Sequence, residues 1–177
     1  KIMIKNFKWL LLVSLTFVAC SESDDEVTAY NSTDGLPVTS GDADFSKYVA
    51  LGDSFAAGYS DGALFKAGQE GSYPNVLAQQ FALAGGGEFT QPYMNDNFGG
   101  LLFMGTQVQN PRLYYNGVAP TMITDLPTTE VTTHLSGAFS NLGVPGAKSF
   151  HLLAPNYGDP AGVPAGTASP YFARFAS

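Results

Sequence analysis

One stretch, Lys47–Tyr59, limits the fold more than any other part of the chain. It begins with the apolar run Tyr48–Leu51, and a glycine ends that run. A short apolar run of this kind predicts a strand that is buried on both faces of a parallel sheet. Gly52–Ser54 then predicts a tight turn, and Phe55–Ala57 predicts a short helix that ends at a glycine.

This order of elements places Ser54 at the carboxyl end of a sheet strand, where open α/β sheets bind their ligands. The stretch G-D-S-F-A-A-G-Y resembles block I of the SGNH (GDSL-type) hydrolases, a family of serine esterases and lipases. The resemblance implies that Ser54 is the nucleophile and that its backbone N–H belongs to the oxyanion hole. It also implies that Gly52 and Asp53 form the supporting turn.

A second informative stretch, Asn141–Ala147, reads N-L-G-V-P-G-A. It resembles block II of the same family, N-x-G-x-x-G-A, and this implies that Gly146 gives the second oxyanion N–H. That N–H must point at developing negative charge with no side chain in the way, which glycine permits. We expect a short helix over Ala147–Leu153. The run G-V-P-G-A-K-S also looks like a phosphate loop, but Ala147 stands where that pattern requires glycine.

The two blocks imply an α/β fold, a three-layer α/β/α sandwich with a parallel, flavodoxin-like sheet that is incomplete in this chain. Between the blocks, Ser72 and Pro74 predict the start of a helix, which three consecutive glycines end. We expect one face of this helix to pack into the core, and its apolar residues at helical spacing are Tyr73, Leu77, Phe81 and Ala84.

The family resemblance implies that residues 88–135 are an insertion over the active-site face, because compact members have a shorter gap between the blocks. The insertion would act as a lid or as a wall for the acyl group, and the alternative is a surface loop without a role. Within it we predict strands over Arg112–Tyr115 and Thr128–Thr133, with Asn116-Gly117 as a turn.

A serine hydroxyl needs a base that takes its proton. In the family, a histidine in a D-x-x-H motif is that base, and an asparagine in a G-x-N-D motif completes the oxyanion hole. His134 and His151 both lack an aspartate three residues earlier, so we expect them to be surface or core residues. The resemblance then implies that residues 44–177 are the N-terminal part of a hydrolase domain. We expect residues 21–177 alone to be poorly stable and inactive on esters.

Residues 1–19 predict a targeting signal, because lysines precede an apolar run that is too short for an ordinary membrane span. The sequence F-V-A-C at its end resembles a bacterial lipobox, which implies lipidation of Cys20, and the alternative is a plain secretory signal. Residues 20–43 begin with an acidic run, which predicts a flexible tether and resembles that of Bacteroidota surface lipoproteins. We expect a lipid-anchored protein of the bacterial cell envelope, at the outer membrane or cell surface.

The acidic composition, with a formal net charge of −7, argues against nucleic-acid binding. The expected function is hydrolysis of an acyl ester, of a lipid or an acylated carbohydrate, by a serine enzyme that uses neither a metal nor a cofactor. The alternative function is a non-catalytic surface lipoprotein. It would bind glycans or lipids through the aromatic side chains of residues 88–135.

Overall fold

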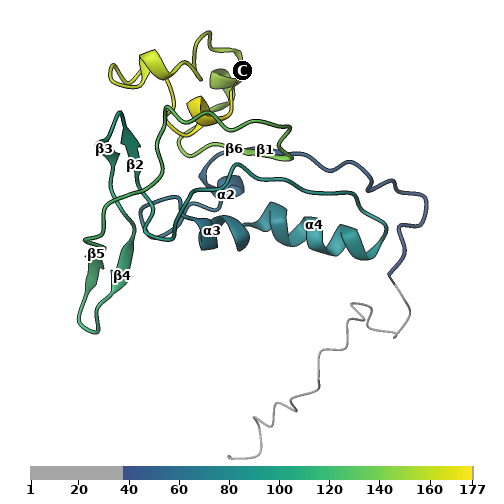
Figure 1. Ribbon diagram of the computed structural model, residues 1–177. Helices are drawn as coiled ribbons and strands as arrows, with labels where there is room; N and C mark the ends of the chain where they lie inside the picture. Colours follow the sequence, from purple (N-terminus) through teal and green to yellow (C-terminus); the bar gives the residue numbers. More distant parts are fainter. Residues whose placement is uncertain (1–37, 177) are drawn as a thin grey trace, which may run out of the picture. The chain divides into compact units, whose positions relative to one another are not determined.

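The computed structural model of the chain describes residues 38–176 (Figure 1). Cys20, the predicted signal and most of the predicted tether lie outside the described residues. No helix between residues 38 and 176 has the length and apolar character that crossing a bilayer requires.

Short helices and small sheets form an α/β fold. The helices are α2 (Ser54–Ala57), α3 (Lys66–Glu70), α4 (Tyr73–Leu83) and the 3₁₀ helices η2 (Ser149–Leu153), η3 (Pro160–Gly162) and η4 (Phe172–Arg174). The strands are β1 (Ala50–Gly52), β2 (Leu101–Phe103), β3 (Thr106–Gln109), β4 (Leu113–Tyr115), β5 (Pro120–Met122) and β6 (Asn141–Gly143). β1 pairs with β6 in parallel, whereas β2–β3 and β4–β5 are antiparallel pairs.

The parallel pair β1–β6 brings the two motifs together (Figure 1). Ala50 lies opposite Asn141, and Gly52 lies opposite Gly143. Helix α2 follows β1 directly and packs so closely on β6 that a Cβ on Gly143 would lie 2.4 Å from the Ala57 nitrogen. Glycine at position 143 is therefore needed for this contact. Because parallel strands share a carboxyl edge, the residues that follow both strands lie at one end of the pair.

The side chain of Asn141 in β6 is almost completely buried and forms a hydrogen bond with α2. Its Nδ2 group donates to the Ala56 carbonyl at 2.8 Å and to Gln91 Oε1 at 2.9 Å. Its Oδ1 atom accepts from the Gly143 N–H at 3.0 Å. Both polar atoms of this buried amide therefore have hydrogen-bond partners, as is usual for buried polar groups.

The segment of residues 88–135 contributes to the hydrophobic core and not only to the surface. Met94, Leu101 and Val131 are buried in the same cluster as Ala57, which follows Ser54 in α2. The residues that complete the cluster are Leu64, Val144, Tyr171 and Ala173. This packing does not fit a surface loop without a role.

The prediction that Tyr48–Leu51 is buried on both faces is wrong. The strand runs from Ala50 to Gly52, and the side chains of Val49 and Leu51 are 58% and 61% exposed. Among the described residues, β1 has a single neighbouring strand, and the face that carries Val49 and Leu51 is more than half exposed. An apolar run indicates that a strand tends to be buried, but it does not identify which element packs against it.

The helix that begins after Ser72 is confirmed as α4, but the prediction of its buried face is wrong. Pro74 and Ala78 are the buried residues, while Tyr73 and Leu77 of the predicted stripe are exposed. Phe81 is partly covered because its ring stacks on Phe45 at 4.5 Å between centroids. The small side chains allow α4 to approach the core closely, and the larger ones project outward.

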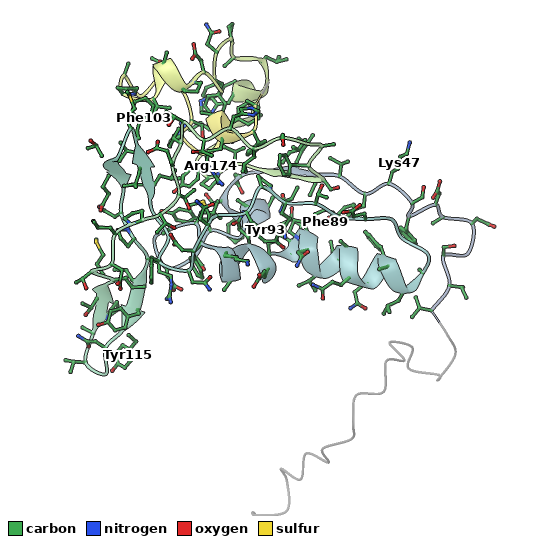
Figure 2. All side chains as sticks on the ribbon, viewed as in Figure 1. Lys47, Phe89, Tyr93, Phe103, Tyr115 and Arg174 are labelled. Atoms are coloured by element: carbon green, nitrogen blue, oxygen red, sulfur yellow. The ribbon has the colours of Figure 1, made fainter. Side chains whose placement is uncertain are left out.

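Three further predictions have different outcomes. The predicted strand and turn are confirmed as β4, which begins one residue later than predicted, and the turn that leads to β5. Tyr115 lies on β4 (Figure 2), and in the turn Asn116 Oδ1 accepts from the N–H groups of Val118 and Ala119. The predicted strand over Thr128–Thr133 is wrong, since a single bridge from Glu130 to Leu102 forms there. The helix expected over Ala147–Leu153 is shorter and has 3₁₀ geometry.

Glu130 closes the β2–β3 turn through its carboxylate. The two oxygens accept from the N–H groups of Met104 at 3.0 Å and Gly105 at 2.9 Å, and Oε1 also accepts from Thr132. Burial raises the pKa of Glu130, but these hydrogen bonds outweigh it, so the net pKa lies below the ordinary value of 4.5. The ionised carboxylate is therefore the form that the fold stabilises.

Replacing Glu130 with glutamine should lower the free energy of unfolding at pH 7 by about 1–2 kcal/mol, because neutral hydrogen bonds replace charge-assisted ones. A group with a lowered pKa in the fold stabilises above its unfolded pKa, and the contribution disappears as the pH falls through the folded pKa. Urea unfolding curves of the variant and the wild type should therefore converge below pH 4.5. Glu88→Gln, an exposed carboxylate, is the control. A difference that stays constant with pH would contradict this role of the charge.

Candidate active site

A pocket of about 540 Å³ holds the two residues that the motifs single out. Ser54 follows β1 and Gly146 follows β6, so both reach the wall from the carboxyl edge of the parallel pair. His151 from η2 lines the same pocket. The rest of the wall is largely polar and aromatic, with the side chains of Tyr59, Gln109, Tyr157, Thr167, Ser169 and Tyr171.

Ser54 is the first residue of α2, and the turn before it is held locally. Asp53 is the N-cap, and its Oδ1 accepts from the Phe55 N–H at 3.0 Å. The Ser54 carbonyl accepts from the Tyr59 N–H at 2.9 Å. The Ser54 hydroxyl has no hydrogen-bond partner within residues 38–176, so it is free to meet a ligand in the pocket. No base from this part of the chain is bonded to it.

Two backbone N–H groups at the pocket are also unpaired. In the part of the chain that the structure describes, neither the Ser54 N–H nor the Gly146 N–H donates to an acceptor. Gly146 has φ +79°, a conformation that side chains rarely allow, and its missing Cβ faces open space. The residues that line the pocket thus include one free hydroxyl and two unpaired amide donors, and donors of this kind stabilise negative charge on a substrate oxygen.

His134 and His151 are both predicted to be surface or core residues, and the structure gives them different surroundings. His134 is exposed, and its Nε2 donates to the Ala176 carbonyl at 2.8 Å, outside the pocket. His151 instead lies on the pocket wall, with its ring stacked on Tyr157 at 4.2 Å between centroids. The only sequence signal for a position on the pocket wall is that His151 follows Gly146 closely in the chain.

Tyr171 lines the pocket, and both Tyr171 and Arg174 are buried. Burial raises the pKa of Tyr171 well above its ordinary value, Tyr59 raises it further, and Arg174 opposes the shift. The side chain of Tyr171 is therefore protonated at neutral pH. Burial lowers the pKa of Arg174 to about 10, and Tyr171 opposes this shift.

The guanidinium of Arg174 ties the C-terminal segment to the segment of residues 88–135. Its Nη2 donates to the Tyr93 carbonyl at 2.6 Å, and Nη1 lies 3.2 Å from Met94 Sδ. The buried Nε has no partner among residues 38–176. The contacts hold η4, and with it Tyr171, in place beside the pocket.

Among the described residues, no group of three or more His, Cys, Asp or Glu side chains is arranged to hold a metal ion. Comparisons of the chain with family models, with curated proteins and with solved structures gave no match. Ser54, the Gly146 loop and His151 are therefore the features from which a function can be argued.

Proposed function

We propose that this chain is part of a serine ester hydrolase of the SGNH type. The observation that carries the proposal is the content of one pocket: the free hydroxyl of Ser54 and the unpaired N–H groups of Ser54 and Gly146. Acyl transfer uses a serine nucleophile together with N–H donors, and residues that could supply both line this pocket. The two motif resemblances lead to the same residues independently.

In the proposed reaction, Ser54 Oγ attacks the acyl carbonyl while a histidine base takes its proton. The N–H groups of Ser54 and Gly146 donate to the oxyanion that forms. The base then gives the proton to the leaving alkoxide, and water releases the acyl group from Ser54. The family resemblance assigns the base to a D-x-x-H motif, which the printed sequence does not contain. No step requires a metal or a cofactor.

We propose further that β1 and β6 belong to a larger parallel sheet in a three-layer α/β/α sandwich. The parallel register of this pair supports the proposal, as does the exposed apolar face that carries Val49 and Leu51. An additional layer on that face would bury both side chains. Attachment to the bacterial envelope through a lipidated Cys20 is part of the same proposal.

The full-length protein should hydrolyse p-nitrophenyl acyl esters, and Gly146→Ala should lower kcat by roughly 10²-fold, the effect of losing one oxyanion donor. The φ of +79° strains an alanine by about 1–2 kcal/mol, although its Cβ meets nothing within 4 Å. Relaxation of that strain turns the N–H away from the pocket. Steady-state kinetics with a series of acyl lengths is the measurement.

Gly166→Ala is a matched control for Gly146→Ala. Gly166 lines the same pocket, has φ +70° and faces open space, but its N–H already donates to the Val163 carbonyl at 3.1 Å. If backbone strain were the cause, Gly146→Ala and Gly166→Ala would lower activity equally. An equal loss in the two variants would therefore contradict an oxyanion role for Gly146. Absence of ester hydrolysis by the full-length wild type would contradict the proposed function itself.

A second candidate function is binding without catalysis. The observation that favours it is the absence, within residues 38–176, of any base bonded to the Ser54 hydroxyl. Tyr114 and Tyr115 on the exposed β4–β5 hairpin would contact a glycan or lipid. Saturable binding of acylated glycans or lipids by a protein that neither hydrolyses esters nor reacts with fluorophosphonates would favour this function.

A further inference from the structure

The tautomer of His151 follows from its contact with the backbone. Nδ1 of the imidazole lies 3.2 Å from the Lys148 nitrogen and accepts its N–H. A backbone N–H is only a donor, so Nδ1 carries no proton in this contact. The neutral ring then has its proton on Nε2, and that nitrogen is a donor without a free lone pair.

Several contacts hold the ring in this orientation. The His151 N–H donates to the Lys148 carbonyl at 2.8 Å, so the two residues are bonded in both directions. One side of the ring stacks on Tyr157 at 4.2 Å, and Phe150 lies at 4.3 Å in an edge arrangement. Nε2 has no hydrogen-bond partner among the described residues, although His151 lines the pocket that holds Ser54.

We propose that His151 is a substrate-binding residue, which donates a hydrogen bond from Nε2 to an oxygen of the ester bound at Ser54. This inference rests on the proposed function, because it takes an acyl ester as the occupant of the pocket. It also separates His151 from the role of base. A base for Ser54 must accept the hydroxyl proton, and the Nε2–H tautomer has no lone pair for it.

Two substitutions distinguish the roles that His151 could have. His151→Gln keeps an N–H donor near the position of Nε2 but loses the ring, whereas His151→Phe keeps the ring and loses the donor. If His151 acts as a hydrogen-bond donor, kcat/KM of the glutamine variant should stay within about threefold of the wild type. The kcat/KM of the phenylalanine variant should then be roughly 10–30-fold lower. If the ring only packs on Tyr157, the phenylalanine variant should instead have the higher kcat/KM of the two.

If His151 were the general base, both variants should lose activity by roughly 10²–10⁴-fold. Either the opposite order or a large loss in both variants would overturn the proposal. His134→Gln, at the exposed histidine outside the pocket, is the control and should leave kcat/KM unchanged. Fluorophosphonate labelling of Ser54 should survive in both His151 variants, since the nucleophile and its base remain.

A second measurement does not depend on turnover. The imidazole ¹⁵N shifts and couplings of His151 in the full-length protein identify which ring nitrogen carries the proton, with His151→Gln assigning the signal. A proton on Nε2 is the expected result, and a proton on Nδ1 would overturn the donor assignment whether or not esters are hydrolysed. A wild type that shows the Nε2 tautomer but no hydrolysis and no labelling would instead refute the proposed function.

Discussion

Replacing Ser54 with alanine should abolish ester hydrolysis by the full-length protein. Removal of the nucleophile of a serine hydrolase lowers kcat by roughly 10⁶-fold. The same variant should lose labelling by a fluorophosphonate, because this reagent reacts with the activated hydroxyl. The fold should be preserved, since the Ser54 hydroxyl makes no hydrogen bond within residues 38–176 and alanine favours a helix.

Ser60→Ala is the matched control for this experiment. Ser60 lies on the same segment, but it is exposed and does not line the pocket. Its replacement should leave both turnover and labelling unchanged. If Ser54→Ala retains either signal while its circular dichroism spectrum matches the wild type, Ser54 is not the nucleophile.

The largest expected effect on stability is that of Asn141→Asp. The buried Nδ2 group lies 2.8 Å from the Ala56 carbonyl and 2.9 Å from Gln91 Oε1, so a carboxylate would face two acceptors. Two donors are lost, and the buried carboxylate would keep only the Gly143 N–H as a donor, which should cost about 3 kcal/mol or more at neutral pH. The melting temperature should fall by about 2–4 °C for each kcal/mol.

The pH dependence of the stability of Asn141→Asp tests whether the buried charge causes the loss. Burial raises the pKa of a carboxyl group, so the folded variant would bind more protons than the unfolded chain between the two pKa values. Its stability relative to the wild type should therefore decrease as the pH rises through that window. Urea unfolding followed by circular dichroism at several pH values measures this.

Asn116→Asp is the control for Asn141→Asp. Asn116 is exposed, and its Oδ1 only accepts hydrogen bonds, which a carboxylate does equally well. Its replacement should change stability by less than about 0.5 kcal/mol. Equal losses in the two variants would show that the buried donors of Asn141 do not hold β6 to α2.

Local features of the fold were predictable from the sequence. Gly58 adopts the left-handed conformation at the end of α2, and Asp53 caps the start of the same helix, as turn chemistry requires. The hairpin at Asn116-Gly117 follows from the same rules. Each of these elements depends on residues that are near one another in the chain.

Features that depend on distant residues were not predictable in the same way. The exposed face of β1 reflects which elements lie beside it, and the apolar run Tyr48–Leu51 contains no information on that. α4 buries Pro74 and Ala78 because small side chains permit close approach. Within the pocket, Ser54 and Gly146 came from motifs, but His151 required the three-dimensional path of η2. The role of Asn141 likewise required its partner Ala56.

The parallel pair β1–β6 has a consequence for how the protein reaches its folded state. The hydrogen bond from Asn141 to Ala56 closes a loop of 85 residues. The entropy of closing such a loop must be overcome before the contact returns any stabilisation, which makes distant parallel pairing slow. During synthesis, Ser54 leaves the ribosome long before Gly146 and His151, which line the same pocket. The nascent chain therefore carries Ser54 before Gly146 can lie on the same pocket wall, and the pocket is complete only when these long-range contacts have formed.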